Sequence, residues 1–223
     1  LILAIPRGGV PVAAEVAEKL HADLDLLMVK KIGAPDNREL AIGAISEDGQ
    51  PWLNSRIISR LGIKTATLKK ISAEKALEVK GQIQKLRGSK KAVPVEGRGL
   101  IVIDDGIATG ATLLAAVHLL RARKPKKIII AAPVAPESTL EEIRKVADDV
   151  VALKTPYPFY AVGDWYHEFT QVEDDEVLKL LHRRDAAGKT DISPEAAREI
   201  TIHDGTAELK ADLQLVQDMK GLV

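Results

Sequence analysis

The sequence predicts an α/β fold with a mainly parallel, twisted sheet that helices flank on both faces. Short apolar segments alternate along the chain with segments in which apolar residues recur every three or four positions. The clearest apolar segments, residues 100–103 and 128–134, show no alternation with polar residues. Strands of this kind are buried on both faces, as in parallel sheets, whereas the spacing of three or four is typical of helices.

The first elements show how this order is built. Residues 1–5 form a buried strand, Pro6-Arg7-Gly8-Gly9 interrupts it, and a helix is expected over residues 10–20. Glu47-Asp48-Gly49-Gln50 predicts a hairpin turn. The further expected strands are 24–29, 40–46, 52–53, 99–103, 127–134 and 150–153, and the further expected helices are 55–86 with an interruption near Gly62, 111–123 and 138–146.

The composition excludes several classes of function. The 223 residues include 32 basic and 32 acidic residues, so the net charge is zero and no bulk positive field favours a nucleic acid or an anionic membrane. The longest apolar run is far shorter than the roughly 20 residues of a membrane-spanning helix. The absence of cysteine excludes disulfides and thiolate chemistry and is compatible with a reducing compartment. We therefore expect a cytoplasmic protein with no nucleic-acid or membrane partner.

The chain divides into three parts. Residues 1–182 carry the α/β pattern, whereas residues 183–199 are polar, contain Gly and Pro and lack an apolar period, which predicts a linker. Residues 200–223 alternate apolar and polar residues around Asp204-Gly205, which predicts a β-hairpin of a second domain. Because the chain starts in one apolar strand and stops in another, we expect a fragment without its N-terminal segment.

One loop concentrates the polar chemistry. Asp104 and Asp105 directly follow a buried strand, and the small residues 106–110 lead into a helix. Ligands bind at the carboxyl ends of strands in open α/β sheets, and a helix N-terminus suits a phosphate. Two adjacent carboxylates can accept hydrogen bonds from vicinal hydroxyls, so the pattern favours a phosphorylated ribose, with Thr109 and Thr112 as further donors. The alternative is that the carboxylates only cap the helix.

Residues 100–112 resemble the 5-phosphoribosyl 1-pyrophosphate (PRPP) binding motif of type I phosphoribosyltransferases. The resemblance implies that Asp104 and Asp105 hold the ribose 2′ and 3′ hydroxyls. It also implies that the 5′-phosphate binds the loop formed by Ala108, Thr109, Gly110, Ala111 and Thr112. Gly106 departs from the branched apolar residue that is common at its position, and we interpret this as a looser loop with unchanged ligand contacts.

The loop after the first strand extends the resemblance. Residues 4–13 are similar to the family's pyrophosphate loop, in which Arg7, Gly8 and Gly9 would hold a dense anion with a guanidinium and free N–H groups. The alternative is a turn with a surface arginine. The resemblance also implies a cis peptide bond between Pro6 and Arg7.

Residues 29–35 and 39–44 resemble a poorly characterised bacterial subgroup of the family, so the resemblance covers residues 1–182. Lys30 and Lys31 end the predicted second strand at the edge of the same crevice. Strand alternation points one of them inward, and which one stays open.

The C-terminal hairpin carries a second resemblance. Residues 200–223 are similar to the opening strands of α/β-hydrolases of the dienelactone hydrolase type, which occur fused to this subgroup. A fused hydrolase domain is therefore expected after Val223. The alternative is a C-terminal extension that packs on the first domain.

Six of the seven aromatic residues lie within residues 157–169. Such a cluster suits stacking on the planar ring of a nucleobase. The stacking candidates are Tyr157, Phe159, Tyr160 and Trp165. The alternative is a small aromatic core that holds a small hood onto the sheet, and both interpretations can apply to different residues.

Charged stretches elsewhere have simpler interpretations. Residues 64–98 contain ten Lys or Arg and three Asp or Glu, which predicts a solvated helix face. The acidic run at 173–176 predicts the N-terminal turn of a helix in preference to a metal site. The five histidines show no metal-ligand spacing.

Together these assignments imply a Mg²⁺-dependent phosphoribosyltransferase of nucleotide metabolism, which transfers the 5-phosphoribosyl group of PRPP to a nitrogen of a planar acceptor and releases pyrophosphate. The catalytic candidates are Asp104, Asp105, Arg7, Lys30 and Lys31, and the two aspartates are also candidate Mg²⁺ ligands, directly or through water. The alternative is a PRPP- or nucleotide-sensing module without turnover. The acceptor and the oligomeric state, a homodimer included, stay open.

Overall fold

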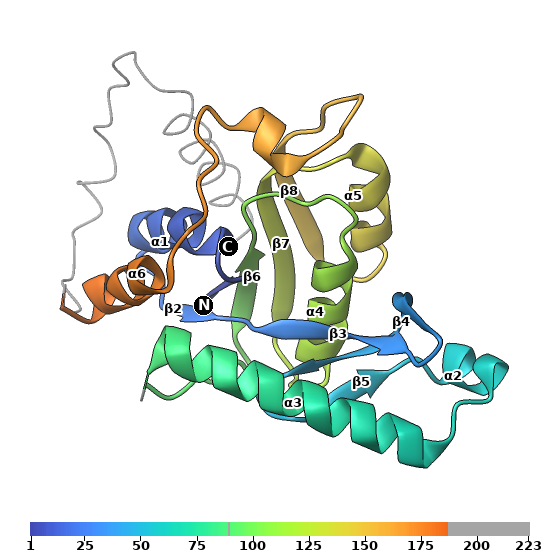
Figure 1. Cartoon of the computed structure of the whole chain (residues 1–223). Helices are drawn as coiled ribbons and strands as arrows, with labels where there is room; N and C mark the ends of the chain where they lie inside the picture. The colour runs from blue at the N-terminus through green and yellow to red at the C-terminus, as the bar shows by residue number, and fades with distance from the viewer. Residues whose placement is uncertain (89, 187–223) are drawn as a thin grey trace.

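The centre of the molecule is a parallel sheet. The computed structural model describes residues 1–88 and 90–186 (Figure 1). Five strands follow in the order β2-β1-β6-β7-β8, and every neighbouring pair is parallel. Their bounds are β1 (Ile2–Ala4), β2 (Leu24–Leu26), β6 (Gly99–Ile103), β7 (Lys127–Val134) and β8 (Asp149–Lys154). The predicted α/β class and its parallel sheet are confirmed.

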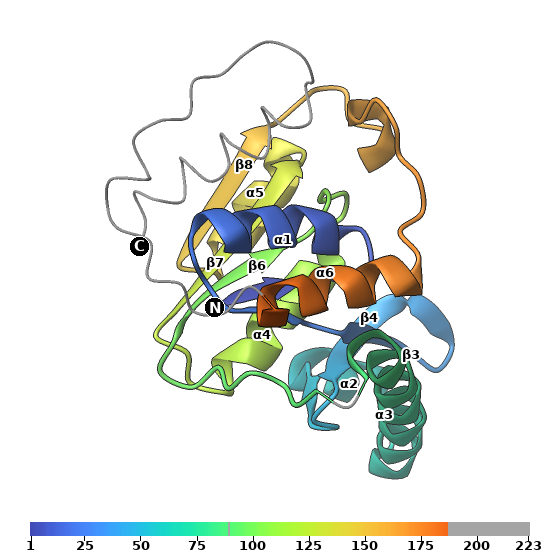
Figure 2. The same cartoon turned by 90° about the vertical axis from the view of Figure 1, so that its left-hand side faces the viewer.

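Helices cover both faces of this sheet. Helices α1 (Gly9–Lys19) and α6 (Asp174–Ala186) lie over one face, and α4 (Ala111–Arg121) and α5 (Glu137–Arg144) over the other (Figures 1 and 2). Strand β6 is apolar throughout because its side chains are buried on both faces of the sheet. Ile101 and Ile103 pack with the α1 side of the core, whereas Leu100 and Val102 pack with the α4 side. A strand in this position buries both sets of side chains.

The strand order places a crevice between β1 and β6. Strand β1 continues through α1 to β2 on one side, and β6 continues through α4 to β7 on the other. The two connections therefore leave adjacent parallel strands in opposite directions. Ligands of open α/β sheets bind at the carboxyl ends of such a pair.

A second, antiparallel sheet lies beside the first. It contains β3 (Val29–Ala34), β4 (Asn37–Ser46) and β5 (Pro51–Leu53). The predicted second strand over 24–29 is wrong in its second half, because β2 ends at Leu26 and a separate strand starts at Val29. Lys30 and Lys31 belong to this ribbon, which has a solvent-exposed side, and not to the doubly buried sheet.

The hairpin turn and the interrupted helix follow the prediction. Strands β4 and β5 pair across the turn at 47–50, where Gly49 has φ 72°. The long helical stretch divides into α2 (Ser55–Leu61) and α3 (Thr65–Arg87), and Gly62 ends α2 with φ 62°. Glycine adopts this left-handed conformation without the steric cost of a Cβ atom.

The last described elements follow β8. The short 3-10 helix η1 (Val162–Trp165) lies in the connection from β8 to α6, and α6 begins within the acidic run, as predicted. Helix α6 continues to Ala186, four residues into the predicted linker. The rest of that linker and the predicted hairpin at 200–223 lie outside the described residues. Among the described residues, no helix has both the length and the apolar character of a membrane span.

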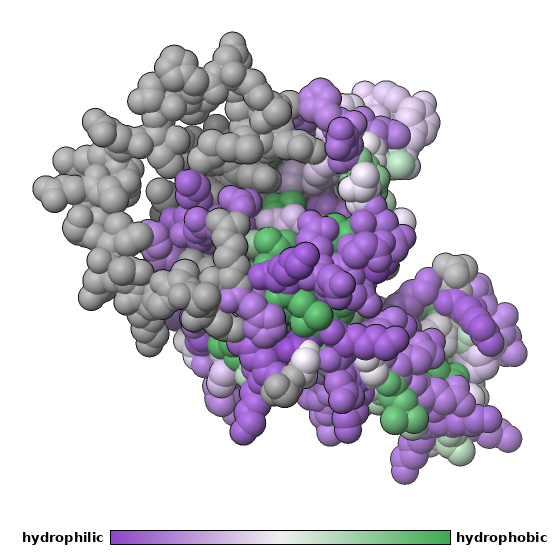
Figure 3. All heavy atoms as spheres, turned by 60° about the vertical axis from the view of Figure 1, so that its left-hand side comes forward, coloured by the Kyte–Doolittle hydropathy of each residue, from purple (hydrophilic) through white to green (hydrophobic). Residues whose placement is uncertain are grey.

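From the side of α1 and α6, the visible described surface is mostly hydrophilic, with hydrophobic residues gathered near the middle of the view (Figure 3).

A buried ion-pair network joins the two sheets. Arg87, the last residue of α3, donates from Nε to Asp25 Oδ1 at 2.8 Å and from Nη2 to the carbonyl of Leu26 at 3.0 Å. The same guanidinium also donates to both carboxylate oxygens of Glu47. The Arg87 and Asp25 side chains are only 5% and 4% exposed. The network connects edge strand β2 with the turn after β4.

Replacing Arg87 with methionine should destabilise the protein strongly. The variant leaves the buried carboxylate of Asp25 without its cation, which typically costs about 3–5 kcal/mol. Urea unfolding of wild type and Arg87→Met measures the loss. Arg98→Met is the matched control, because Arg98 pairs with Asp23 at 2.6 Å with both side chains partly exposed, and such a pair contributes roughly 0–1 kcal/mol. Equal losses in the two variants would contradict the network's role.

Candidate functional site

The loops after β1 and β6 touch each other. A Cβ atom added to Gly8 would lie 1.9 Å from Asp105 Oδ2, and one added to Gly9 would lie 2.6 Å from the carbonyl oxygen of Ile103. The Ile5 N–H donates to the same Ile103 carbonyl at 2.8 Å. Only glycine leaves room for this approach. The expected cis peptide bond between Pro6 and Arg7 is present in this loop.

The two carboxylates of Asp104 and Asp105 lie side by side and are half-buried. The Asp105 N–H donates to Asp104 Oδ1 at 3.0 Å. Burial, together with the neighbouring charge of Asp105, raises the pKa of Asp104 well above its usual range, and burial also raises the pKa of Asp105. The pair therefore retains a proton to a higher pH than isolated aspartates do.

The predicted phosphate loop presents backbone groups to solvent. Gly110 lies at the start of α4 with φ 68°, and the residues around it, Ala108, Thr109, Ala111 and Thr112, are exposed. Because Gly110 has no capping side chain, the first N–H groups of α4 are available to an anion. The Leu114 N–H is the first to be satisfied within the helix, by the Gly110 carbonyl at 2.8 Å.

Thr139 of α5 supports this loop. Its hydroxyl donates to the Ala108 carbonyl at 2.8 Å, and its Cγ2 would lie 2.6 Å from a Cβ atom at Gly110. No sequence pattern singles out Thr139, because it lies beyond the next strand and belongs to no motif.

Arg7 points to the acidic start of α6. Its Nη1 donates to Asp174 Oδ1 at 3.2 Å and lies 3.7 Å from Glu173 Oε2. The acidic run at 173–176 is thus the first turn of a helix and also the source of the carboxylates that face the predicted pyrophosphate loop. An incoming anion has to compete with them for the guanidinium.

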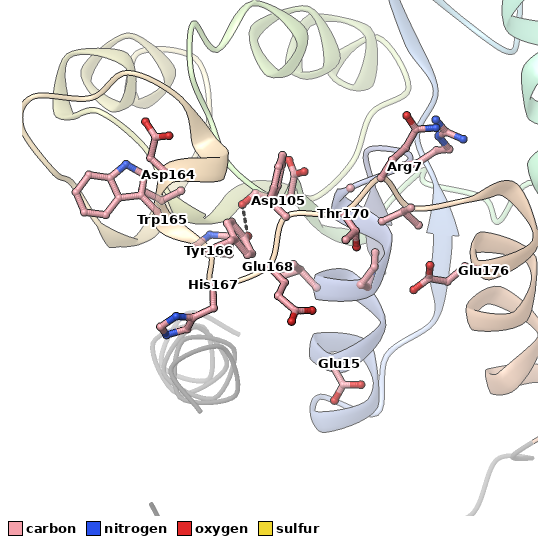
Figure 4. A pocket seen from close by; sticks show the side chains of 18 of the residues that line it. Arg7, Glu15, Asp105, Asp164, Trp165, Tyr166, His167, Glu168, Thr170 and Glu176 are labelled. Atoms are coloured by element: carbon pink, nitrogen blue, oxygen red, sulfur yellow. Dashed lines mark hydrogen bonds between the residues drawn. The ribbon is translucent and has the colours of Figure 1, made fainter. Parts of the chain in front are cut away.

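A cleft of about 890 Å³ opens beside these loops (Figure 4). Arg7, Gly8 and Asp105 are among the residues that line it. Helices α1 and α6, the ends of β7 and β8, and residues 164–172 of the connection to α6 form the rest of its walls. Its volume is typical of sites for small organic ligands.

The aromatic cluster divides between the cleft and the solvent. Trp165 lines the cleft, as do Tyr166 and Phe169, whose rings lie 5.2 Å apart in a tilted arrangement. Tyr157 and Tyr160 are 98% and 83% exposed. Their stacking role stays a prediction, as does that of the half-buried Phe159, which does not line the cleft.

Lys30 and Lys31 are not brought to this cleft. Lys30 Nζ lies 3.1 Å from Glu78 Oε2 of α3, and Lys31 is exposed on β3. The prediction placed them at the end of β2, whereas both belong to β3 of the antiparallel ribbon. Neither lysine lines the cleft, and their catalytic role stays a prediction.

The donor set is compatible with Mg²⁺ held jointly with a substrate. Among residues 1–88 and 90–186, no group of three or more His, Cys, Asp or Glu side chains is placed to hold a metal ion. Asp104 and Asp105 offer two carboxylates at the mouth of the crevice. Mg²⁺ commonly binds through one or two carboxylates while phosphates and water complete its shell.

The chain belongs to the family of the phosphoribosyl transferase domain, whose model matches residues 1–176. Two provisionally named phosphoribosyl transferases of Mycobacterium tuberculosis, from strains CDC 1551 / Oshkosh and ATCC 25618 / H37Rv, are each 38% identical over 230 residues, covering 100% of this chain and 52% of their own length. The chain thus spans about half the length of these curated relatives.

A solved structure has a similar fold. The crystal structure of TT1426 from Thermus thermophilus matches with a TM-score of 0.76 and 35% identity, and the match covers 82% of this chain and 86% of that one. The five-stranded parallel sheet with its smaller antiparallel sheet is therefore a phosphoribosyltransferase fold.

Removing the nearer partner of Arg7 should strengthen anion binding. We expect Asp174→Asn to bind inorganic pyrophosphate roughly two- to fivefold more tightly, which corresponds to one exposed ion pair. Isothermal titration calorimetry measures the affinity. Asp175→Asn is the control, because it removes the same charge from the same turn and Asp175 makes no ion pair with Arg7 in the described part of the chain. If the two variants bind pyrophosphate with identical affinity, Asp174 does not compete with pyrophosphate for Arg7.

Replacing Asp104 with asparagine should stabilise the fold in a pH-dependent way. A carboxyl with a raised pKa in the folded state stabilises that state at low pH and loses this contribution as pH rises through the folded value. The Tm of Asp104→Asn should therefore match wild type at acidic pH and exceed it at alkaline pH, by roughly 2–4 °C for each kcal/mol gained. Thermal melts with a chelator present test this, and a constant difference across pH would refute it.

Proposed function

We propose that the protein transfers the 5-phosphoribosyl group of PRPP to a nitrogen of a planar acceptor. The observation that carries the proposal is the contact between Gly8 and the carboxylate of Asp105. It joins an arginine-glycine loop suited to pyrophosphate with two carboxylates suited to ribose hydroxyls. A donor that carries pyrophosphate directly on a ribose matches this arrangement, and membership of the phosphoribosyl transferase domain family supports it.

Each loop then has one role. Asp104 and Asp105 accept hydrogen bonds from the 2′ and 3′ hydroxyls and stabilise positive charge that develops on the ribose. The N–H groups around Gly110 bind the 5′-phosphate. Arg7, turned away from Asp174, binds the pyrophosphate.

The reaction requires no protein nucleophile. The acceptor nitrogen forms a bond to C1′ of the ribose, the bond from C1′ to the pyrophosphate oxygen breaks, and that electron pair leaves with the pyrophosphate. The proton of the acceptor nitrogen passes to water. Asp104 and Asp105 would hold Mg²⁺, directly or through water, and the ion would supply charge neutralisation to the departing pyrophosphate. The protein contributes mainly position and electrostatic stabilisation.

The cleft is the proposed acceptor site. It starts at Asp105 and continues to Trp165 and Phe169, so a planar ring held against these side chains lies next to the ribose. Aromatic side chains stack on such rings.

One observation favours a sensing module as a second candidate. Arg7 is paired with Asp174 and Glu173, so the predicted pyrophosphate loop is neutralised in the described structure. A sensor would bind PRPP without turnover.

Pyrophosphate release distinguishes the two candidates. The full chain is incubated with PRPP, Mg²⁺ and a panel of purine, pyrimidine and other nitrogen bases. Release that depends on one base supports the transferase, whereas PRPP binding without release for any base supports the sensor. Absence of PRPP binding would contradict both.

Each of Asp104→Asn and Asp105→Asn should weaken PRPP binding. Loss of charge-assisted hydrogen bonds to the ribose costs about 1.5–3 kcal/mol, or roughly 10- to 150-fold in Kd. Calorimetric titration with Mg²⁺–PRPP measures the effect. Asp36→Asn is the matched control, since Asp36 is exposed in the turn between β3 and β4. If Asp104→Asn and Asp105→Asn both bind PRPP with wild-type affinity, the assignment of these carboxylates to the ribose is refuted.

A further inference from the structure

Asp105 is held at three points, one within its own loop and two from other segments of the chain. Its N–H donates to Asp104 Oδ1, and its carboxylate lies against Gly8. Its carbonyl accepts a hydrogen bond from the hydroxyl of Tyr166, which follows η1 in the connection from β8 to α6 (Figure 4). The third point comes from the wall of the cleft and not from either loop of the crevice.

Gly106 brings the same wall onto the next residue of the loop. A Cβ atom at Gly106 would lie 2.3 and 2.8 Å from the two methyl carbons of Val162, and 3.1 Å from Cγ1 of Val134. Gly106 is buried, so the interpretation of a looser loop is wrong. The missing side chain admits Val162 of η1 directly against the loop.

The segment that makes these contacts also makes contacts within itself, although none of the residues of η1 is buried. Asp164 Oδ2 accepts from the Ala161 N–H at 3.2 Å, which closes the turn of η1. A Cβ atom at Gly163 would lie 2.9 Å from the ring of Phe169, and that ring also contacts Tyr166. Val162, Tyr166 and Phe169 therefore belong to one compact unit, which also carries Trp165.

We infer that Tyr166 is a positioning residue. It keeps the ribose-binding carboxylate of Asp105 at a fixed position relative to Trp165 and Phe169, the other aromatic residues of the cleft. The inference rests on the proposed function. Tyr166 acts through the backbone of Asp105, while Val162 against Gly106 keeps η1 seated on the loop.

Tyr166→Phe tests the first contact, because it removes only the hydroxyl. We expect Mg²⁺–PRPP to bind about three- to tenfold more weakly, the range for one neutral hydrogen bond. Inorganic pyrophosphate without Mg²⁺, which engages only the Arg7 loop, should bind as in wild type. This selective loss is not expected from a general loss of stability, which thermal melts report separately.

Other results of the same titrations have distinct meanings. Unchanged PRPP affinity, or equal losses for PRPP and pyrophosphate, would overturn the positioning role. If wild type binds no PRPP, the proposed function fails before the variant is compared.

Gly106→Ala tests the second contact independently of the hydroxyl. The added methyl group collides with Val162, so we expect weaker PRPP binding. In Gly106→Ala/Val162→Ala the two closest contacts are gone, so most of the affinity should return, with Val162→Ala completing the double-mutant cycle. Wild-type affinity in Gly106→Ala, or no recovery in the double variant, would overturn the inference.

Discussion

Two chain connections leave neighbouring parallel strands in opposite directions and must share the space at the ends of β1 and β6. The sharing is possible because the first connection carries no side chain where it meets the second. Gly8 lies against the carboxylate of Asp105, and Gly9 against the carbonyl of Ile103. A larger residue at position 8 would displace the Asp105 carboxylate, and one at position 9 would collide with the backbone at Ile103 and Asp104. The proposed ribose and pyrophosphate sites therefore depend on the contact between the loops after β1 and β6, where the two chain connections diverge.

The same proximity has an electrostatic consequence. Half-buried carboxylates with raised pKa values lie beside a loop whose only arginine is paired with the first turn of α6. The crevice therefore favours the binding of a cation. A substrate that binds together with a cation would reduce the repulsion between the carboxylates of Asp104 and Asp105. It would also leave Arg7 able to bind an anion. The contacts of Arg7 connect the proposed donor site to the position of α6.

Local patterns in the sequence were sufficient for the sheet and the main loop. The unbroken apolar runs at β6 and β7 predicted strands buried on both faces, because this pattern depends only on the residues of the strand. Asp104, Asp105 and the small residues up to Gly110 predicted a strand, a ligand loop and a helix start in that order. The turn at Gly49 and the helix end at Gly62 followed from glycine's conformational freedom.

Long-range contacts were not predictable in this way. A run of six residues predicted one strand at 24–29, but pairing with β4 decided that Lys30 belongs to the antiparallel ribbon. The roles of Thr139 under the phosphate loop and of Tyr166 on Asp105 depend on elements far along the chain. The sequence by itself determined which residues are apolar, small or charged at each strand end, because backbone conformation and burial respond to local composition. Only the tertiary structure decided which of those ends meet and which side chains they hold in place, because a contact between distant segments depends on how all the elements pack.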